Sequence, residues 1–161
     1  MSISKGGCLC GNVRYEVNGP PDWVTVCFCK FCQRATGGPQ MTEPIHHISA
    51  FEVTRGTPKV YTHISGGSGK EVYIHFCADC GTKTHLTFER WPDRLGVYAG
   101  TFDDPGWFDM TPENTKFIFV GEAARGTMVP AGFKTFSEHA ATADGIPMDP
   151  EILSEVLHIR R

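Results

Sequence analysis

The sequence lacks several features that would place it in a broad class of protein. Its apolar stretches reach only three or four residues, far short of the roughly 20 that span a bilayer. The amino-terminal segment has no apolar core of the kind found in secretory signals, which predicts a cytoplasmic protein. Basic residues are not in excess: 15 Lys and Arg stand against 18 Asp and Glu, a net charge of −3. We therefore expect neither a nucleic acid nor a membrane as a partner.

The chain also lacks internal repeats, low-complexity stretches and charge runs. Its 161 residues, 40% of them hydrophobic, predict one globular domain with a core of its own. The 18 glycines and 11 prolines indicate many turns and therefore short strands. We expect a domain over residues 1–140 and a carboxyl-terminal extension over residues 141–161, and leave the oligomeric state open.

Short hydrophobic segments, some alternating with polar residues and one, Phe117–Val120, continuous, recur along the domain and predict a mainly β fold. These segments are Val13–Val17, Trp23–Val26, Phe51–Val53, Val60–Tyr61, Val72–Phe76, Thr84–Phe88, Leu95–Tyr98 and Phe117–Val120. The extension differs, because Asp149 and Pro150 resemble a helix start and the apolar residues after them share one helical face. A short helix is predicted over residues 149–161.

Seven cysteines are the most informative feature, since heavy cysteine use in a reducing compartment favours metal or redox chemistry over disulfides. Cys8 and Cys10 form one pair and Cys77 and Cys80 another, and a glycine directly follows each pair. Structural zinc takes four such ligands about 2.3 Å from the ion, commonly from two close-spaced pairs. The four cysteines are therefore predicted to bind one zinc ion, although Cys27 or Cys32 could replace one of them.

The remaining cysteines, Cys27, Cys29 and Cys32, would give a second zinc ion three ligands and leave its fourth position open. Three thiolates make the ion electron-rich and a poor source of hydroxide, but they suit a substrate thiol, which coordination would deprotonate. Lys30 and Arg34 flank the cluster, where they would either contact an anionic substrate or remain solvated.

Other interpretations of these segments stay open. A histidine such as His75 or His85 could close the second site and make it structural. Cys29 and Cys32 could instead cycle as a redox dithiol, although the βαβ context of such motifs is missing. The glycine-rich segment Gly66–Lys70 resembles a phosphate loop only superficially, because Glu71 stands where Ser or Thr is needed, and it is predicted to be a hairpin turn.

Three blocks of sequence, together and in order, resemble one known family. They are GGCLCGNVRY from Gly6, CFCKFCQRATGG from Cys27 and FCADCGT from Phe76, and Ala99–Pro105 resembles a fourth block. The chain is similar, over about residues 3–138, to the glutathione-dependent formaldehyde-activating enzyme and centromere protein V family. It departs from the usual family pattern at Ala124–Gly126 and over Met128–Phe136.

The resemblance implies a β-tent, a set of short antiparallel sheets leaning together around two zinc sites. It implies structural zinc ligands at Cys8, Cys10, Cys77 and Cys80, and an active-site zinc held by Cys27, Cys29 and Cys32. The named member adds glutathione to formaldehyde to give S-hydroxymethylglutathione, and family members are classed as carbon–sulfur lyases. Glutathione, or another small thiol, is the partner that the resemblance implies.

The sequence therefore predicts a zinc-dependent carbon–sulfur lyase or synthase acting on a small thiol adduct. Candidate substrate contacts are Lys30, Arg34 and Lys70, and no spacing singles out a general acid or base from Asp103, Asp104, Lys70 and His75. The alternative is a zinc-stabilised binding module without turnover, as the centromere protein branch allows. A basic tail or disordered arm would favour that alternative, and the sequence has neither.

Overall fold

The computed structural model describes residues 2–160 and is mainly β, as predicted. Two compact units make up the chain. The first contains the residues up to Trp23 together with Pro44–Asp109, and the second contains Val24–Glu43 and the residues from Met110 onward. No helix among the described residues is long and apolar enough to cross a membrane. Each unit contains one of the two cysteine clusters, and all the cysteines of a cluster belong to the same unit.

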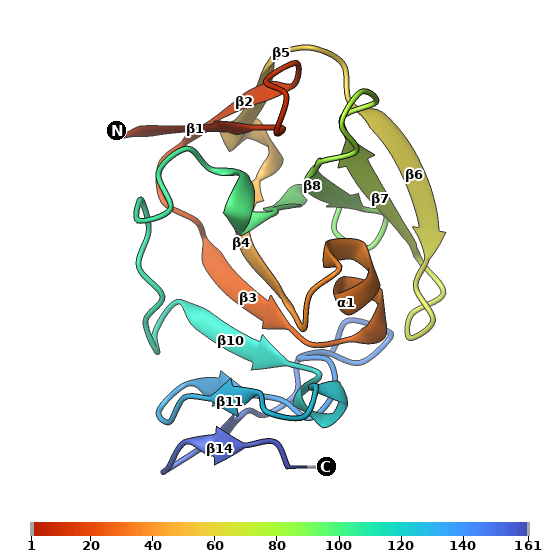
Figure 1. Ribbon diagram of the computed structural model, residues 1–161. Coiled ribbons are helices and arrows are strands. Elements are labelled where there is room, and N and C mark those ends of the chain that lie inside the picture. The colour runs from red at the N-terminus through yellow and green to blue at the C-terminus, as the bar shows by residue number, and fades with distance from the viewer. Residues whose placement is uncertain (1, 161) are drawn as a thin grey trace. The chain divides into compact units, whose positions relative to one another are not determined.

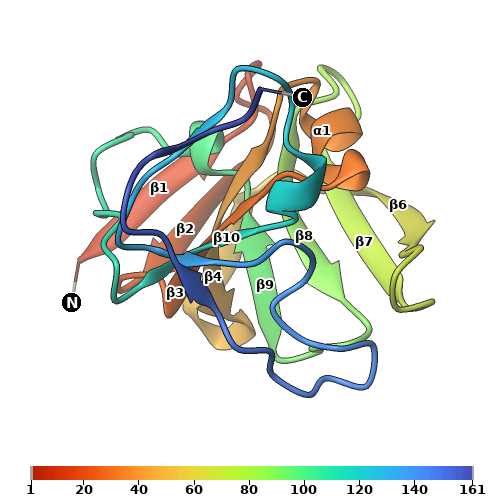
Figure 2. The same cartoon turned by 90° about the horizontal axis from the view of Figure 1, so that it is seen from below.

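The first unit consists of antiparallel strands. One sheet has the order β1–β2–β5, with bounds Ile3–Gly7, Arg14–Asn18 and Phe51–Arg55. A second set runs in the order β4–β9–β8–β7–β6, with bounds Met41–His47, Arg94–Val97, Lys83–Phe88, Glu71–Phe76 and Lys59–Ile64. Of β4, only the part from Pro44 onward belongs to this unit. Figure 2 shows β9, β8 and β7 side by side. The strands predicted in this unit are confirmed, whereas β1 and β4 had no clear alternating signal.

The core of the first unit forms where alternating residues of these strands face inward. Tyr15 and Val17 of β2 pack with Leu95 and Val97 of β9 and with Phe102. Tyr15 is almost completely buried, and its hydroxyl lies 2.8 Å from the hydroxyl of Thr101. Two short 3₁₀ turns, Ile48–Ala50 and Ala99–Thr101, connect strands of this unit.

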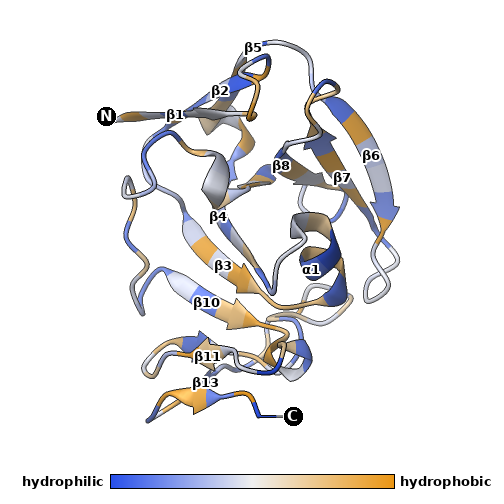
Figure 3. Cartoon of the chain, viewed as in Figure 1, coloured by the Kyte–Doolittle hydropathy of each residue, from blue (hydrophilic) through white to orange (hydrophobic). Residues whose placement is uncertain are grey.

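The second unit is built on β3 (Trp23–Cys27) and β10 (Thr115–Ile118), which pair in parallel (Figure 1). Beyond β10 come β12 (Lys134–Thr135), also parallel to it, and β13 (Glu151–Ile152). This unit therefore adds parallel pairs of strands to the antiparallel pairing expected from the sequence, which it keeps between β12 and β13. Parallel pairing is possible here because long connections return the chain to the same end of the sheet. Hydrophobic segments of β3 and β10, visible in Figure 3, build a core around Val26, Phe28 and Phe117.

The unit also contains a helix that the sequence analysis missed. The segment Cys27–Cys32 was treated as one loop, but α1 spans Lys30–Thr36 and therefore includes Cys32. Cys29 caps the helix start, since its sulfur accepts a hydrogen bond from the Cys32 amide at 3.4 Å. Gly37 ends the helix with a positive φ of 71°, a conformation that glycine adopts without strain. The helix is only two turns long, too short for a hydrophobic period to stand out in the sequence.

The predicted helix at residues 149–161 is wrong for the residues described, and Arg161 lies outside them. The segment instead forms β13, which pairs with β12, and β14 (Leu157–His158), which pairs with β11 (Met128–Val129). Ile152 and Val156, expected on a buried helical face, are exposed, whereas Ile159 joins the core. A helix this short is marginal alone, and strand pairing supplies the backbone with partners that lie outside the segment.

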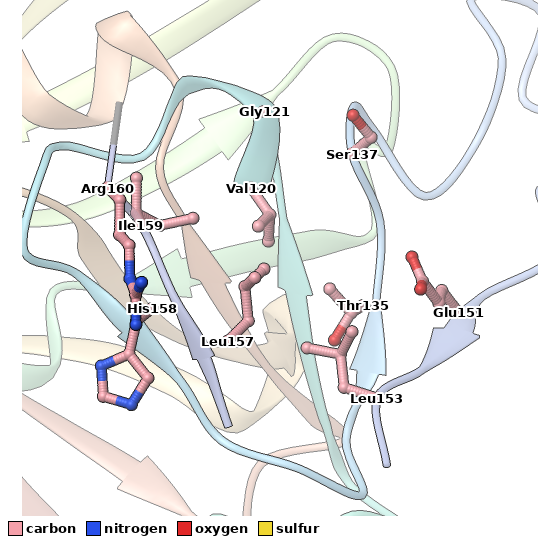
Figure 4. Close-up of a pocket in the computed structure, with 10 residues that line it drawn as sticks. All are labelled: Val120, Gly121, Thr135, Ser137, Glu151, Leu153, Leu157, His158, Ile159 and Arg160. Atoms are coloured by element: carbon pink, nitrogen blue, oxygen red, sulfur yellow. The ribbon is translucent and has the colours of Figure 1, made fainter. Parts of the chain in front are cut away.

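A pocket of about 400 Å³ separates this extension from β10 and the turn that follows it. Figure 4 shows Val120 and Leu157 pointing toward each other across the hollow, with His158 and Arg160 at one side and Glu151 at the other. The turn is η3 (Val120–Glu122), and Gly121 is packed so closely on Ser137 that a Cβ atom there would lie 2.9 Å from the Ser137 carbonyl oxygen.

Candidate metal centres

Four cysteines meet in the first unit, as the sequence predicted. The sulfurs of Cys8, Cys10, Cys77 and Cys80 all lie within 4.8 Å of one another. The Sγ atoms of Cys8 and Cys10 are 3.5 Å apart, and those of Cys10 and Cys77 are 3.7 Å apart. Tetrahedral ligands 2.3 Å from a zinc ion would be separated by roughly 3.8 Å. The two measured separations are close to that value, so the four sulfurs could hold a zinc ion.

Two tight turns of similar construction hold these sulfurs in place. The amide of Cys8 donates to the Val13 carbonyl at 3.0 Å, and the amide of Cys77 donates to the Thr82 carbonyl at 2.9 Å. The glycine after each pair has a positive φ, 77° at Gly11 and 73° at Gly81, as such a tight turn requires. Within the first turn the Val13 amide donates a hydrogen bond to Cys8 Sγ at 3.2 Å.

Three cysteines meet in the second unit. Cys27 ends β3, Cys29 caps α1 and Cys32 lies in its first turn, and their sulfurs are within 4.8 Å of one another. Cys27 and Cys32 are buried, and Cys29 is partly exposed. No histidine or carboxylate completes this ligand group in the part of the chain that the structure describes. The histidine closure considered from the sequence has no support here.

The thiols of this cluster share protons unequally. Hydrogen bonds from Cys27 and Cys32 lower the pKa of Cys29. Hydrogen bonds with Cys27 and Cys29, together with burial, raise the pKa of Cys32 well above its usual range. One thiolate is therefore stabilised by two neutral thiols, and full ionisation of all three would need a cation among them. A divalent ion that prefers sulfur would supply that charge if it bound among the three sulfurs.

Hydrogen bonds tie the cysteine-bearing loop to the η3 turn. The Gln33 side-chain amide donates to the Phe28 carbonyl at 2.6 Å and to the Glu122 carbonyl at 3.0 Å. Glu122 in return accepts from the Lys30 amide at 3.0 Å through its carboxylate. Phe119, just before η3, has a positive φ of 56°, which is uncommon for a bulky residue. These contacts fix the backbone between Cys27 and Cys32 from both ends.

The predicted substrate contacts do not all lie in one unit. Lys30 and Arg34 are exposed on α1, one turn apart on the helix that carries Cys32. Lys70 belongs to the first unit, where its ammonium group lies 2.9 Å from the Glu89 carboxylate. The segment around it is a hairpin turn between β6 and β7, as predicted, with the Ser65 amide bonded to the Lys70 carbonyl at 2.9 Å.

The groups considered as general acids or bases have partners of their own in the first unit. Asp103 pairs with Arg14, and Asp104 accepts from the Gly106 amide at 2.9 Å. His75 lies 2.9 Å from the Thr87 hydroxyl and stacks on His85 with ring centroids 4.0 Å apart. Burial lowers the pKa of His75. Each of these three groups therefore already has at least one hydrogen-bond partner within the first unit.

Sequence reasoning missed a different residue, Glu43. It is 7% exposed, lies near the start of β4 in the second unit, and its Oε1 atom has no hydrogen-bond partner. Burial, together with the negative charge of Cys29, raises its pKa to about 8, and Lys116 opposes this shift. Met41, Glu43 and Ile45 are all buried, and their spacing of two residues is the pattern that could have predicted a strand here. The charge of Glu43 and the presence of Pro44 hide this pattern in the sequence.

The chain is similar to several known proteins. The family model described as glutathione-dependent formaldehyde-activating enzyme matches residues 3–121. A Halomonas elongata protein named "putative glutathione-dependent formaldehyde-activating enzyme" is 26% identical over 104 residues, which cover 63% of this chain and 66%, just under two thirds, of that relative. A crystal structure of a Rhodobacter sphaeroides protein is 29% identical with a TM-score of 0.49, covering 62% of this chain and 87% of that one.

The matched segment contains both cysteine clusters, and their order and spacing agree with the three blocks noted in the sequence. The chain belongs to the glutathione-dependent formaldehyde-activating enzyme family.

Proposed function

We propose that this chain is a zinc-dependent enzyme that forms or cleaves a carbon–sulfur bond in a small thiol adduct. Glutathione is the thiol that the family favours, with formaldehyde as the partner in the adduct S-hydroxymethylglutathione. The observation that carries the proposal is the cluster of Cys27, Cys29 and Cys32, three converging sulfurs with no fourth ligand among residues 2–160. Four sulfurs suit a structural ion, whereas three leave room for a substrate.

In this proposal Cys8, Cys10, Cys77 and Cys80 hold a structural zinc ion, and Cys27, Cys29 and Cys32 hold the second. A zinc ion bound by three thiolates would keep a substrate thiol ionised at neutral pH, which makes the sulfur nucleophilic. The chain's own contribution is to fix the ligands. Cys29 is held by the Cys32 amide, and Gln33 and Glu122 clamp the loop on either side.

Titration calorimetry of the zinc-loaded protein with glutathione tests the proposal. We expect a dissociation constant in the millimolar range or tighter for the wild type, and no measurable binding for Cys29→Ser. Cobalt substitution gives a second readout, because a thiolate added to the three-cysteine ion should strengthen the sulfur-to-metal charge-transfer band.

The matched control is Cys10→Ser, which alters the four-cysteine cluster and should leave the spectral response to glutathione in place. A protein that holds two zinc ions and neither binds glutathione nor changes its cobalt spectrum would contradict the enzyme proposal. The zinc-stabilised binding module would then be the better description.

A further inference from the structure

The structure leaves one acidic side chain unexplained. Glu43 is the buried carboxyl group among residues 2–160, and its Oε1 atom has no hydrogen-bond partner. Leaving a buried polar atom unpaired costs roughly 1–3 kcal/mol, and a buried charge costs more. A buried polar atom normally has a hydrogen-bond partner. The unpaired Oε1 atom of Glu43 is therefore available to a ligand that the protein binds.

Glu43 belongs to the unit that carries the three-cysteine cluster, and it interacts electrostatically with it. The negative charge of Cys29 disfavours ionisation of Glu43, and the positive charge of Lys116 on β10 favours it. The Glu43 carboxyl group is therefore close enough to Cys29 to respond to its charge, and its Oε1 atom accepts no hydrogen bond.

Glu43 is also not one of the metal ligands. Its oxygens fall outside the group of ligand atoms that lie within 4.8 Å of one another, which contains only the three sulfurs. A carboxyl group near such a cluster, yet outside the ligand group, can contact what binds there. On a thiol adduct, the atom that needs such a contact is the oxygen on the carbon next to sulfur.

We propose that Glu43 is the acid–base residue of the three-cysteine site, which exchanges a proton with the oxygen of the carbon that joins or leaves the substrate sulfur. The inference rests on the proposed function and adds to it the proton-transfer group that the sequence did not identify. It also explains why an acid is buried at this position with a free oxygen atom.

The proton and electron balance is simple. In the forward direction the thiol loses its proton to solvent when it binds as a thiolate. The sulfur lone pair then forms the C–S bond, the C=O π electrons move to oxygen, and that oxygen takes the proton of Glu43. Solvent reprotonates the Glu43 carboxylate. In the reverse direction the carboxylate removes the hydroxyl proton, C=O reforms, and the C–S electrons return to sulfur.

The test compares Glu43→Gln with wild type, using the zinc-loaded protein, glutathione and ¹³C-formaldehyde. Exchange NMR measures the rate at which formaldehyde and the S-hydroxymethyl adduct interconvert above the uncatalysed rate. We expect the rate of Glu43→Gln to fall by about 10²-fold or more, the usual size of a general acid–base contribution. Zinc content and glutathione affinity should stay within about twofold of wild type.

Two further variants sharpen the test. Glu43→Asp keeps a carboxyl group and should recover part of the lost rate, about tenfold over Glu43→Gln. Glu155→Gln removes an exposed carboxyl group in the same unit and should behave as wild type. Infrared difference spectra at neutral pH should show the C=O stretch of a protonated carboxyl in wild type that Glu43→Gln lacks.

A Glu43→Gln rate within about threefold of wild type would overturn the inference, as would loss of zinc in that variant, which would make Glu43 structural. Unchanged infrared spectra would also overturn it, because the carboxyl group would then be ionised. If wild type neither binds glutathione nor accelerates exchange, the proposed function itself fails. That outcome is visible in wild type alone and so is distinct from a failure specific to Glu43.

Discussion

At the scale of single residues, the cationic side chains predicted as substrate contacts differ in how fully their charges are compensated. Arg34 is exposed at the last turn of α1, whereas the ammonium group of Lys70 is engaged by Glu89. A surface cation without a fixed partner can contact the carboxylates of glutathione at little cost. For a glutathione substrate, Arg34 is therefore a better candidate contact than Lys70.

We therefore expect Arg34→Gln to weaken glutathione binding about threefold to tenfold at low salt, the effect of one partly screened charge. Lys70→Gln, the matched control, should change the affinity less than twofold. Calorimetry at two ionic strengths measures both, and the difference between the variants should shrink at high salt. Equal effects from the two variants would contradict a local contact, because the affinity would then depend only on the net charge of the protein.

His46 gives the first unit a predictable response to acid. It is 1% exposed and stacks on Trp107 with ring centroids 5.8 Å apart, and its Nε2 atom has no partner. Burial lowers its pKa to about 4, although Asp22 opposes the shift. The unfolded chain, with a histidine pKa near 6.5, binds the proton first as pH falls. Stability is therefore complete above about pH 6.5 and declines down to about pH 4.

We expect this decline to amount to as much as about 3 kcal/mol at pH 4, because each pKa unit corresponds to about 1.4 kcal/mol. His46→Phe should flatten the pH dependence of the free energy of unfolding in that window, measured by urea titration. His158→Gln, an exposed histidine, should keep the wild-type slope. An unchanged slope in His46→Phe would place the acid sensitivity elsewhere.

At the scale of the secondary-structure element, β1 can pair closely with β2 only because residue 6 is a glycine. A Cβ atom on Gly6 would lie 2.2 Å from the Tyr15 hydroxyl oxygen and 2.5 Å from the Thr101 carbonyl oxygen. Tyr15 cannot move away easily, because its ring is buried and stacked on Phe51 at 5.1 Å. The close pairing of β1 with β2 therefore needs a residue without a side chain.

We expect Gly6→Ala to destabilise the protein by about 2 kcal/mol, within the range of overpacking in cores. Gly67→Ala is the matched control, since nothing lies within 4 Å of a Cβ atom there, and it should change stability by less than about 0.5 kcal/mol. Thermal and urea unfolding measure both. A tolerated alanine at Gly6 would mean that β1 can separate from β2 without cost.

The elements also show which features the sequence could and could not predict. Paired cysteines before glycines identified the turns that bring four sulfurs together, since the spacing of these residues is a local property that survives folding. Alternating patterns located most strands for the same reason. The tail was misread because Ile152 and Val156 match a helical face, while the pairing that decides their structure depends on the distant β12 and β11.

The burial of Glu43 could not be predicted from the sequence for a related reason. Its burial follows from the packing of β4 and not from neighbouring residues, so the sequence offers no pattern that singles out this glutamate. The helix α1 was hidden because its cap is a cysteine, which looks like a metal ligand and not like a helix start. Residues with two roles are therefore the ones where sequence patterns mislead.

At the scale of the whole molecule, each compact unit carries its own cysteine cluster. The four-cysteine cluster lies on the turns that close β1 onto β2 and β7 onto β8. Structural zinc contributes several kcal/mol to the domain that holds it. The three-cysteine cluster, with fewer ligands, should bind its ion less tightly and contribute less to folding.

We therefore expect two zinc ions per chain in native mass spectra, and a chelator under reducing conditions should remove them in two separate steps. Hydrogen exchange should show the first step confined to the second unit, at the amides around Cys27–Cys32. The second step should release the protected amides of Cys8 and Cys77, whose bonds close the metal-binding turns. Cys29→Ser should show only the second step and Cys10→Ser only the first. Loss of both ions in one step, with exchange rising everywhere at once, would instead mean that the two units fold as one cooperative whole in which neither ion stabilises its own unit alone.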